Sequence, residues 1–303
     1  MQSPFLRLGR ILHVALGAAV LLIAAGCSTR FPHVKKSATA SEQAEAHAIF
    51  ERCLAAHGGD IRTFAEDLNL SIDGTWSTLI QRIQPLVTDS AYRITAQERF
   101  RPSDQLYAVW WQGPAGTKKV LRTPTTVEVT YNGIRELDEK KLQAAAMTAD
   151  AFQLFHLGPS FLQMRRAAFV RLDDAREAGV TYQRLLTTLR PGLGFSPADD
   201  VVIWINPRTG RLFRVHLTLN GFETTQGAHV DTTFLEYRQL GRLLLPTRFR
   251  ERVRGPIRIH AHDWWMTGAD LARGWDAAAV SGPDAAGAAA APAKSVDSLP
   301  VAR

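Results

Sequence analysis

The feature that most constrains the fold is a succession of strand-like runs between residues 201 and 265. The runs cover residues 201–205, 211–219, 229–238, 243–253 and 257–265. Two of the gaps are the turn clusters Asn206-Pro207-Arg208-Thr209-Gly210 and Gly255-Pro256. Connections this short join antiparallel neighbours and leave no room for crossover helices. The stretch predicts a meandering antiparallel sheet that the rest of the chain extends and covers.

The N-terminus has the pattern of an export signal. Arg7 and Arg10 precede an apolar run over residues 11–25, which is shorter than the roughly 20 residues of a membrane-spanning helix. The run ends in Ala24-Ala25-Gly26-Cys27. Small residues directly before a cysteine, after such a run, resemble the lipobox of bacterial lipoprotein signal peptides. The alternative is a plain secretory signal with a coincidental cysteine.

The lipobox resemblance implies a lipid anchor. On this resemblance residues 1–26 are removed, Cys27 is acylated and becomes the mature N-terminus, and residues 27–38 form a tether. Ser28 stands where an inner-membrane retention signal has Asp, so the resemblance implies the outer membrane, on its periplasmic face. The chain has two cysteines, and an acylated Cys27 leaves Cys53 without a partner for an internal disulfide.

Two stretches have helical patterns. Thr39 and Glu42 have capping-box spacing, and His57-Gly58-Gly59 ends the helix that they begin. Within this helix Cys53 is expected to be buried, whereas His47 and His57 are expected at the surface. Residues 138–157 have helical periodicity, and Ser160 is a candidate cap for a short helix up to residue 166. Together they predict a helical insert over residues 138–166.

The remaining segments alternate between strands and turns. Regular alternation predicts the first strand at residues 68–76. Further strands are predicted at residues 92–101, 106–112, 117–123, 126–131, 168–172 and 180–190, with residues 78–87 as a candidate strand broken at Pro85. Asn132-Gly133 is a hairpin signal. Residues 277–303 are rich in Ala, Gly, Pro and Ser, which predicts a disordered tail after a domain at residues 39–276.

The predicted fold is mainly β, of the α+β type: a strongly curved antiparallel sheet of about 11–12 strands with an N-terminal helix and the helical insert on its concave face. The element order and the lipobox resemble the half-barrel of the lipoprotein-carrier superfamily, roughly over residues 41–270. Looser points of likeness are His57-Gly58-Gly59, Asp73-Gly74-Thr75-Trp76, Tyr131-Asn132-Gly133, residues 200–210 and Leu245-Pro246-Thr247. That superfamily contains the periplasmic lipoprotein chaperone, its outer-membrane receptor and mycobacterial lipid carriers. The resemblance implies an apolar concave face that the insert lines or plugs.

Large apolar side chains are the candidate ligand contacts. A lipid chain gains about 0.8 kcal/mol for each methylene that it buries. The candidates are Trp110, Phe152, Phe155, Trp204, Phe222 and Trp264. The alternative for each of them is an ordinary place in the core.

Charge and motifs argue against several other classes of function. The net charge is +7, of which Arg7 and Arg10 contribute two, and basic residues elsewhere are interleaved with acidic ones, so no nucleic-acid partner is expected. No motif for nucleophilic catalysis, phosphate binding or a CxxC site is present, so no catalytic residue, metal or cofactor is expected. His260 and His262 have a spacing that metal sites use, and His216, His229 and Asp231 fall on nearby predicted strands. A solvated strand face is the simpler interpretation of this set.

The sequence therefore predicts a monomeric, lipid-anchored, periplasm-facing protein that binds a lipophilic ligand. That ligand is a lipid or an acylated protein, the role lies in lipoprotein or lipid trafficking, and the protein is not an enzyme. One alternative is an envelope structural or assembly accessory whose cavity is plugged by the insert. Another is a metal-dependent hydrolase that uses His260 and His262. An open apolar concavity favours the first hypothesis.

Overall fold

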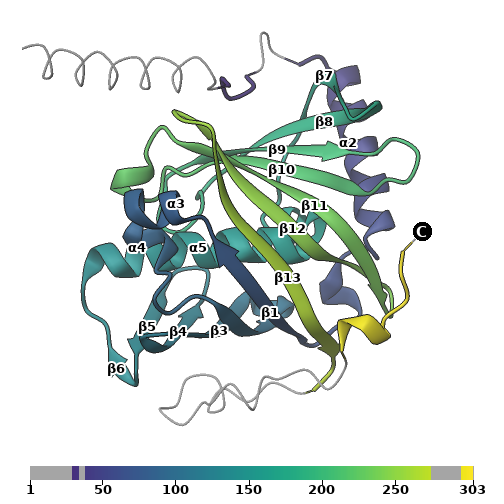
Figure 1. The fold of residues 1–303 in the computed structure, drawn as a ribbon. Helices are drawn as coiled ribbons and strands as arrows, with labels where there is room; N and C mark the ends of the chain where they lie inside the picture. Colours follow the sequence, from purple (N-terminus) through teal and green to yellow (C-terminus); the bar gives the residue numbers. More distant parts are fainter. Residues whose placement is uncertain (1–28, 34–37, 274–294, 303) are drawn as a thin grey trace, which may run out of the picture.

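The structure is a computed structural model that describes residues 29–33, 38–273 and 295–302. The predictions for the signal, for acylation at Cys27 and for residues 277–294 of the tail lie outside the described residues. Figure 1 follows the chain from α2 to the C-terminal segment.

The described chain forms one 13-stranded antiparallel sheet that curves strongly without closing (Figure 1). The strands are β1 (Leu68–Trp76), β2 (Thr95–Arg101), β3 (Leu106–Gly113), β4 (Gly116–Arg122), β5 (Val127–Tyr131), β6 (Ile134–Arg135), β7 (Val170–Glu177), β8 (Val180–Leu189), β9 (Asp199–Ile205), β10 (Leu212–Thr218), β11 (His229–Leu240), β12 (Leu243–Gly255) and β13 (Ile259–Leu271). The predicted fold class is confirmed. The sheet has more strands than predicted, partly because the two-residue β6 follows the Asn132-Gly133 turn.

The order of the strands explains the half-barrel. Neighbouring strands follow one another in sequence, except that β1 pairs with β13 in the middle of the sheet, with Leu68 opposite Leu271. The two free edges are therefore β6 and β7, which are consecutive strands in the sequence. The segment between them must cross from one edge to the other, and it does so as the helical insert.

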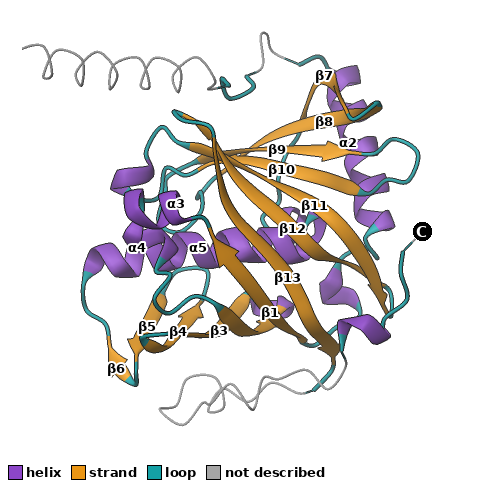
Figure 2. Ribbon diagram, viewed as in Figure 1, coloured by secondary structure: helices purple, strands orange, loops and turns teal. Residues whose placement is uncertain are grey.

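The helices are α2 (Ala40–Ala56), α3 (Thr78–Ile83), α4 (Pro85–Thr88), α5 (Glu139–Leu157) and α6 (Pro159–Met164), with short 3₁₀ turns η1 (Ile61–Thr63), η2 (Pro102–Asp104), η3 (Glu223–Thr225) and η5 (Val296–Ser298). Figure 2 shows α5 inside the curve of the sheet and α3–α4 beside it. All residues from Ala149 to Leu157 are buried, so this half of α5 is apolar or paired on every side. The prediction that the insert covers the concave face is confirmed.

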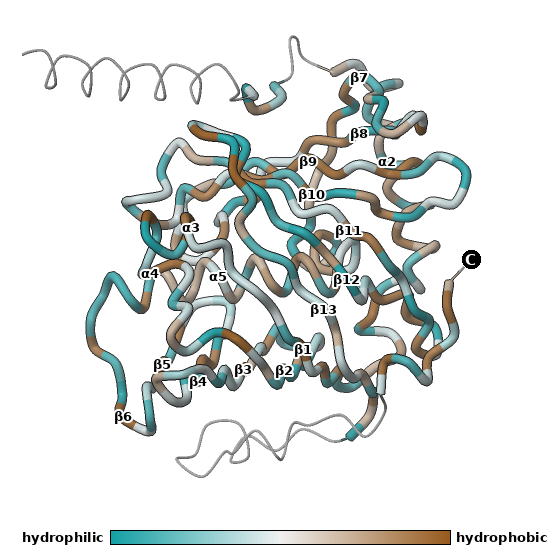
Figure 3. Tube along the Cα trace, in the orientation of Figure 1, coloured by the Kyte–Doolittle hydropathy of each residue, from teal (hydrophilic) through white to brown (hydrophobic). Residues whose placement is uncertain are grey.

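Side chains alternate between the two faces along the strands, and hydrophobic and hydrophilic residues follow one another there (Figure 3). Residues on the concave face join α5 in one large apolar core, for example Trp111 against Phe152, whose ring centroids are 5.5 Å apart. A second, small cluster of Phe31, Leu172, Leu186 and Val202 lies apart from this core.

Residues 78–87 are helical, so the strand predicted there is wrong. Ser77 caps α3 by accepting a hydrogen bond from the backbone N–H of Ile80 at 3.4 Å. Pro85, which was interpreted as breaking a strand, occupies the first turn of α4, where its missing N–H costs nothing. The cap and the proline were both visible in the sequence.

Two smaller predictions also need correction, and a third is confirmed. Ser160 does not cap α6, which follows Gly158 without a side-chain cap; its hydroxyl instead accepts from the N–H of Ile61 at 2.9 Å. His57 is buried and accepts a 3.0 Å hydrogen bond from the N–H of Leu212 through its Nε2. Cys53 is buried in α2 as predicted.

Both described terminal segments pack on the sheet. Phe31, in the predicted tether, is 8% exposed, and the N–H of Thr29 donates to the carbonyl of Arg254 at 3.1 Å. At the other end Val296 and Leu299 are buried against the sheet, and Val301 bridges to Arg238. Residues 295–302 are therefore packed, which corrects that part of the predicted disordered tail.

Candidate ligand cavity

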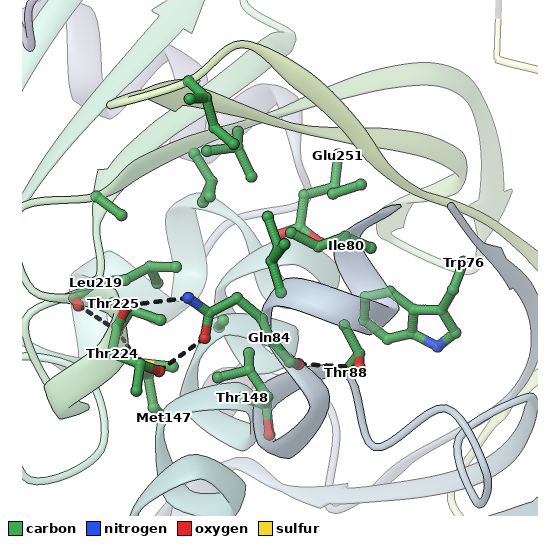
Figure 4. Close-up of a pocket in the computed structure, with 18 of the residues that line it drawn as sticks. Trp76, Ile80, Gln84, Thr88, Met147, Thr148, Leu219, Thr224, Thr225 and Glu251 are labelled. Atoms are coloured by element: carbon green, nitrogen blue, oxygen red, sulfur yellow. Dashed lines mark hydrogen bonds between the residues drawn. The ribbon is translucent and has the colours of Figure 1, made fainter. Parts of the chain in front are cut away.

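An apolar cavity of about 270 Å³ lies between α3–α4, α5 and the concave face of the sheet (Figure 4). From α3–α4 its wall includes Ile80, Ile83 and Val87, and from the sheet it includes Val230 and Val253. The wall contributed by α5 consists of Met147, Thr148, Ala151, Phe152 and Phe155. Helix α5 thus fills much of the half-barrel and leaves one hollow beside the α3–α4 segment.

The α3–α4 segment is short and is held over the cavity by two hydrogen bonds between one pair of residues. Gln84, between the two helices, donates through Nε2 to the carbonyl of Thr224 at 2.9 Å and accepts from the Thr224 hydroxyl at 2.7 Å (Figure 4). Thr224 belongs to η3, in the loop before β11. On the outer side, Leu79 and Leu86 are exposed. The segment is therefore a small lid with exposed apolar side chains, joined to the opposite rim by side-chain hydrogen bonds accessible to water.

The cavity contains one buried cation. Arg93 is 2% exposed, and its Nη1 donates to the carbonyl of Val87 at 2.7 Å. Its guanidinium carbon lies 4.7 Å from the ring centroid of Trp111, 5.2 Å from that of Trp76 and 5.3 Å from that of Phe152. Burial lowers the pKa of Arg93, but an arginine stays protonated in proteins. A full positive charge therefore lies against an apolar wall.

A carboxyl group and an imidazole also lie at this wall. Glu251 of β12 lines the cavity, and burial raises its pKa to about 7, while the charge of Arg93 acts in the opposite direction. Opposite it on β13, His262 is fully buried and stacks on Trp76 with ring centroids 3.7 Å apart. Burial lowers the pKa of His262 far below its ordinary value, so this ring is neutral at pH 7. Within the described chain neither of its ring nitrogens has a hydrogen-bond partner.

The histidine set considered as a metal site is not brought together. A β-bulge between β12 and β13 places His262 opposite Glu251 and His260 opposite Arg252. Glu251 and Arg252 are consecutive, so their side chains point to opposite faces of the sheet, and the two imidazoles therefore lie on opposite faces as well. The shared face predicted for them, and the solvated position predicted for His262, are both wrong. His216 and His229 contact each other and Phe31. Within residues 29–33, 38–273 and 295–302 no group of three His, Cys, Asp or Glu residues is placed to hold a metal ion.

Two of the six aromatic candidates line the cavity. These are Phe152 and Phe155, both on α5. Trp264 is fully buried next to them, with its ring centroid 4.9 Å from that of Phe152. Phe222 is also buried, in the same core. Binding of a ligand by these residues remains a prediction.

Trp110 and Trp204 lie elsewhere, which corrects their predicted location. Trp111 and Ile203 point into the main core, so their neighbours Trp110 and Trp204 point to the opposite face of the sheet. There Trp110 lies below the Lys119 ammonium, at 6.0 Å, and Trp204 packs on the small outer cluster. Uniformly apolar runs such as residues 106–111 contain no alternation from which the inward face can be inferred.

Sequence reasoning missed Arg93, Trp76 and the lid. Arg93 is a single basic residue before a strand, and no pattern marks it as buried. The lid did carry a signal, because Ile80, Ile83 and Val87 have the spacing of one helix face after a serine cap.

No family model matches the sequence, and neither does any curated protein. Among solved structures, a DUF1329 family protein from Desulfovibrio piger has a TM-score of 0.47 at 10% identity, over 78% of this chain and 97% of its own. A LolA superfamily protein from Nitrosomonas europaea has a TM-score of 0.44 at 12% identity, over 77% of this chain and 96% of its own. A putative outer membrane lipoprotein-sorting protein domain from Vibrio parahaemolyticus has a TM-score of 0.41 at 9% identity, over 79% of this chain and 97% of its own.

The structural neighbours thus include the class of fold that the sequence resembles. At TM-scores below 0.5 they carry no functional inference. Among the described residues no helix is both long and apolar enough to span a bilayer.

Proposed function

We propose that this chain is a lipid-anchored protein on the periplasmic face of the outer membrane that binds a lipophilic ligand in the cavity below α3–α4. The ligand is a lipid or the acyl chain of a protein, and the role is one of binding or transfer rather than catalysis. The observation that carries the proposal is the apolar hollow between α5 and the lid. Apolar, largely preformed cavities with few polar groups are the usual sites for such ligands.

The size of the cavity limits what it accepts. Pockets for drug-sized ligands hold about 300–1,000 Å³, and about 270 Å³ lies just below that range. The hollow therefore fits one acyl chain rather than several. At about 0.8 kcal/mol per buried methylene, the affinity for a linear chain rises about tenfold for every two methylenes until the cavity is full.

The proposal is tested on a soluble form that begins at residue 27 and carries Cys27→Ala, purified from a bacterial periplasm. Native mass spectrometry with lipid extraction identifies any ligand that co-purifies. Binding of N-phenyl-1-naphthylamine, an uncharged fluorescent probe of apolar cavities, is then measured in competition with linear lipids of increasing length. We expect saturable binding that strengthens with chain length and then reaches a plateau.

A cavity-filling variant locates the site. Ala151 lines the cavity on α5, whereas Ala55 is exposed on α2. Ala151→Leu should reduce binding at least about tenfold by occupying space, and Ala55→Leu should not. A clean apo mass together with no probe binding, or equal binding by both variants, would contradict the proposal.

The competing role is that of a structural accessory with a plugged interior. The burial of every residue of α5 from Ala149 to Leu157 favours this alternative. The same measurements separate the two roles, because a plugged interior binds neither the probe nor a lipid. The separation of His260 from His262 leaves the hydrolase hypothesis without a site.

A further inference from the structure

We infer that the ligand of this cavity is a single-chain amphiphile with an anionic headgroup, and that Arg93 binds that headgroup. The inference rests on the proposed function and narrows it to one class of ligand. An acyl chain attached to a protein through an ester or amide has no such charge, so the inference also chooses between the two ligands proposed above.

Arg93 differs from three other buried cations of the described chain, each of which has a carboxylate in contact. Lys118 pairs with Asp89 at 2.6 Å, Arg122 with Asp150 at 2.9 Å, and Arg214 with Asp231 at 3.6 Å. In the described part of the chain no carboxylate oxygen lies within 4.0 Å of the Arg93 guanidinium. The charges of Asp89 and Glu251 act on Arg93 only from beyond that distance. Burying a charge without a carboxylate in contact costs free energy that an anionic ligand would restore.

The contacts that Arg93 does make hold it in position without saturating it. Two backbone carbonyls, those of Val87 at 2.7 Å and Thr88 at 3.4 Å, accept from Nη1. The rings of Trp76, Trp111 and Phe152 surround its guanidinium carbon. Its Nε has no acceptor among the described residues. A guanidinium has five N–H donors in a fixed plane that suits a carboxylate or a phosphate, so donors remain for an incoming headgroup.

The other polar groups at this wall are compatible with an added negative charge. Glu251 faces Arg93, the neutral His262 of β13, and the charge of Asp231 from β11. Because its pKa is about 7, Glu251 takes up a proton at little cost when an anion enters near pH 7. A protonated carboxyl can also donate a hydrogen bond to that anion. The wall therefore accepts one anion most readily at or below neutral pH.

The first experiment compares headgroups on one chain. The delipidated soluble form is titrated with dodecanol, dodecanoic acid and dodecyl phosphate in competition with N-phenyl-1-naphthylamine. We expect at least one of the two anions to bind about tenfold more tightly than the alcohol, and the tighter one identifies the headgroup chemistry. Equal or weaker binding of both anions would overturn the inference while leaving the proposed function intact. Failure of the wild type to bind the probe or any of these chains would instead contradict the proposed function itself.

Variants assign the preference to Arg93. Arg93→Met keeps the length of the side chain and removes its charge. In this variant the affinities for the two anions and for the alcohol should lie within about threefold of each other, while the probe still binds. Arg82→Met removes an exposed arginine from α3 and is the matched control. A headgroup preference that survives in Arg93→Met would overturn the assignment.

A measurement that does not depend on folding of the Arg93 variant uses pH. Dodecyl sulfonate stays charged between about pH 6 and pH 8, whereas Glu251, with a pKa of about 7, ionises across that range. Its affinity for the wild type should fall severalfold as the pH rises, and that of Glu251→Gln should stay level. The same fall in both proteins, or a level response in the wild type, would count against an anion site beside Glu251.

Discussion

The buried ion pair that fixes α5 across the half-barrel offers the sharpest test of how this fold is held together. Arg122 of β4 donates to both carboxylate oxygens of Asp150 on α5, from Nε at 3.0 Å and from Nη2 at 2.9 Å. Both side chains are at most 4% exposed. The carboxylate also accepts from the N–H of Gly194 at 2.8 Å, and Arg122 donates to the carbonyl of Gly194 at 2.9 Å. One carboxylate thus joins the sheet, the insert and the loop before β9.

We predict that Asp150→Asn lowers the free energy of unfolding by about 3–5 kcal/mol, the usual cost of leaving one member of a buried pair uncompensated. Replacing both partners by Arg122→Met and Asp150→Leu should recover most of that loss, because no buried charge then lacks a partner. The exposed pair Arg101–Asp104 is the control, since its side chains are 29% and 48% exposed. Asp104→Asn should cost less than about 1 kcal/mol.

Urea unfolding of the soluble form, followed by circular dichroism, measures these differences. With a slope of about 3 kcal/mol/M for a domain of this size, the midpoint of Asp150→Asn should fall by at least about 1 M. A fall as small as that of Asp104→Asn would refute the reasoning. A double variant that is less stable than Asp150→Asn would also refute it, because the loss of stability would then not come from the unpaired buried charge of Arg122.

Three further predictions follow from the cavity and its walls. Folding raises the pKa of Glu251 from 4.5 to about 7. Relative to Glu251→Gln, the wild type should therefore have its full stability below pH 4.5 and lose it as the pH rises to 7. If the thermal unfolding midpoints of the two proteins differ by the same amount at both ends of this range, the shift is contradicted. An added Cβ at Gly74 would lie 2.3 Å from Cε3 of the fully buried Trp264, so Gly74→Ala should cost at least about 1–3 kcal/mol in urea unfolding, and an unchanged midpoint would show that Trp264 can move. Gln84→Ala removes both side-chain hydrogen bonds between the lid and Thr224. Stopped-flow mixing should then show faster association and dissociation of N-phenyl-1-naphthylamine than in Gln43→Ala, a control at an exposed position. Equal rates in the two variants would mean that the lid does not limit entry.

The sequence predicted the fold well where alternation was regular. The predicted bounds of β1 are those observed, and the insert over α5 and α6 was found from its helical periodicity. The sequence was less informative about which face of the sheet a side chain occupies. In β13 a bulge brings His262 inside, and in β3 the unbroken apolar run concealed which of Trp110 and Trp111 points inward.

The candidate cavity was predictable in kind but not in its details. The apolar face of α5, with Phe152 and Phe155, follows from helical spacing. The position of Arg93 depends instead on three rings and two carbonyls that come from separate segments of the chain. Contacts assembled in this way leave no periodic trace in a single sequence, so the anion site could be found only in three dimensions.

If Cys27 carries the proposed lipid anchor, the docking of residues 29–33 on the sheet limits how far the protein can stand off from a bilayer. Two peptide units separate Cys27 from Thr29, so the two Cα atoms are at most about 7 Å apart. Thr29 is bonded to Arg254, directly before the Gly255-Pro256 turn, and Pro256 and Ile257 form part of the cavity rim. With an acyl group on Cys27, the connection between the lipid and the folded domain would therefore be too short for the molecule to tumble freely. Under the proposed anchoring, the acyl group would act as a pivot that keeps this rim close to the headgroups, where the effective concentration of lipid is highest.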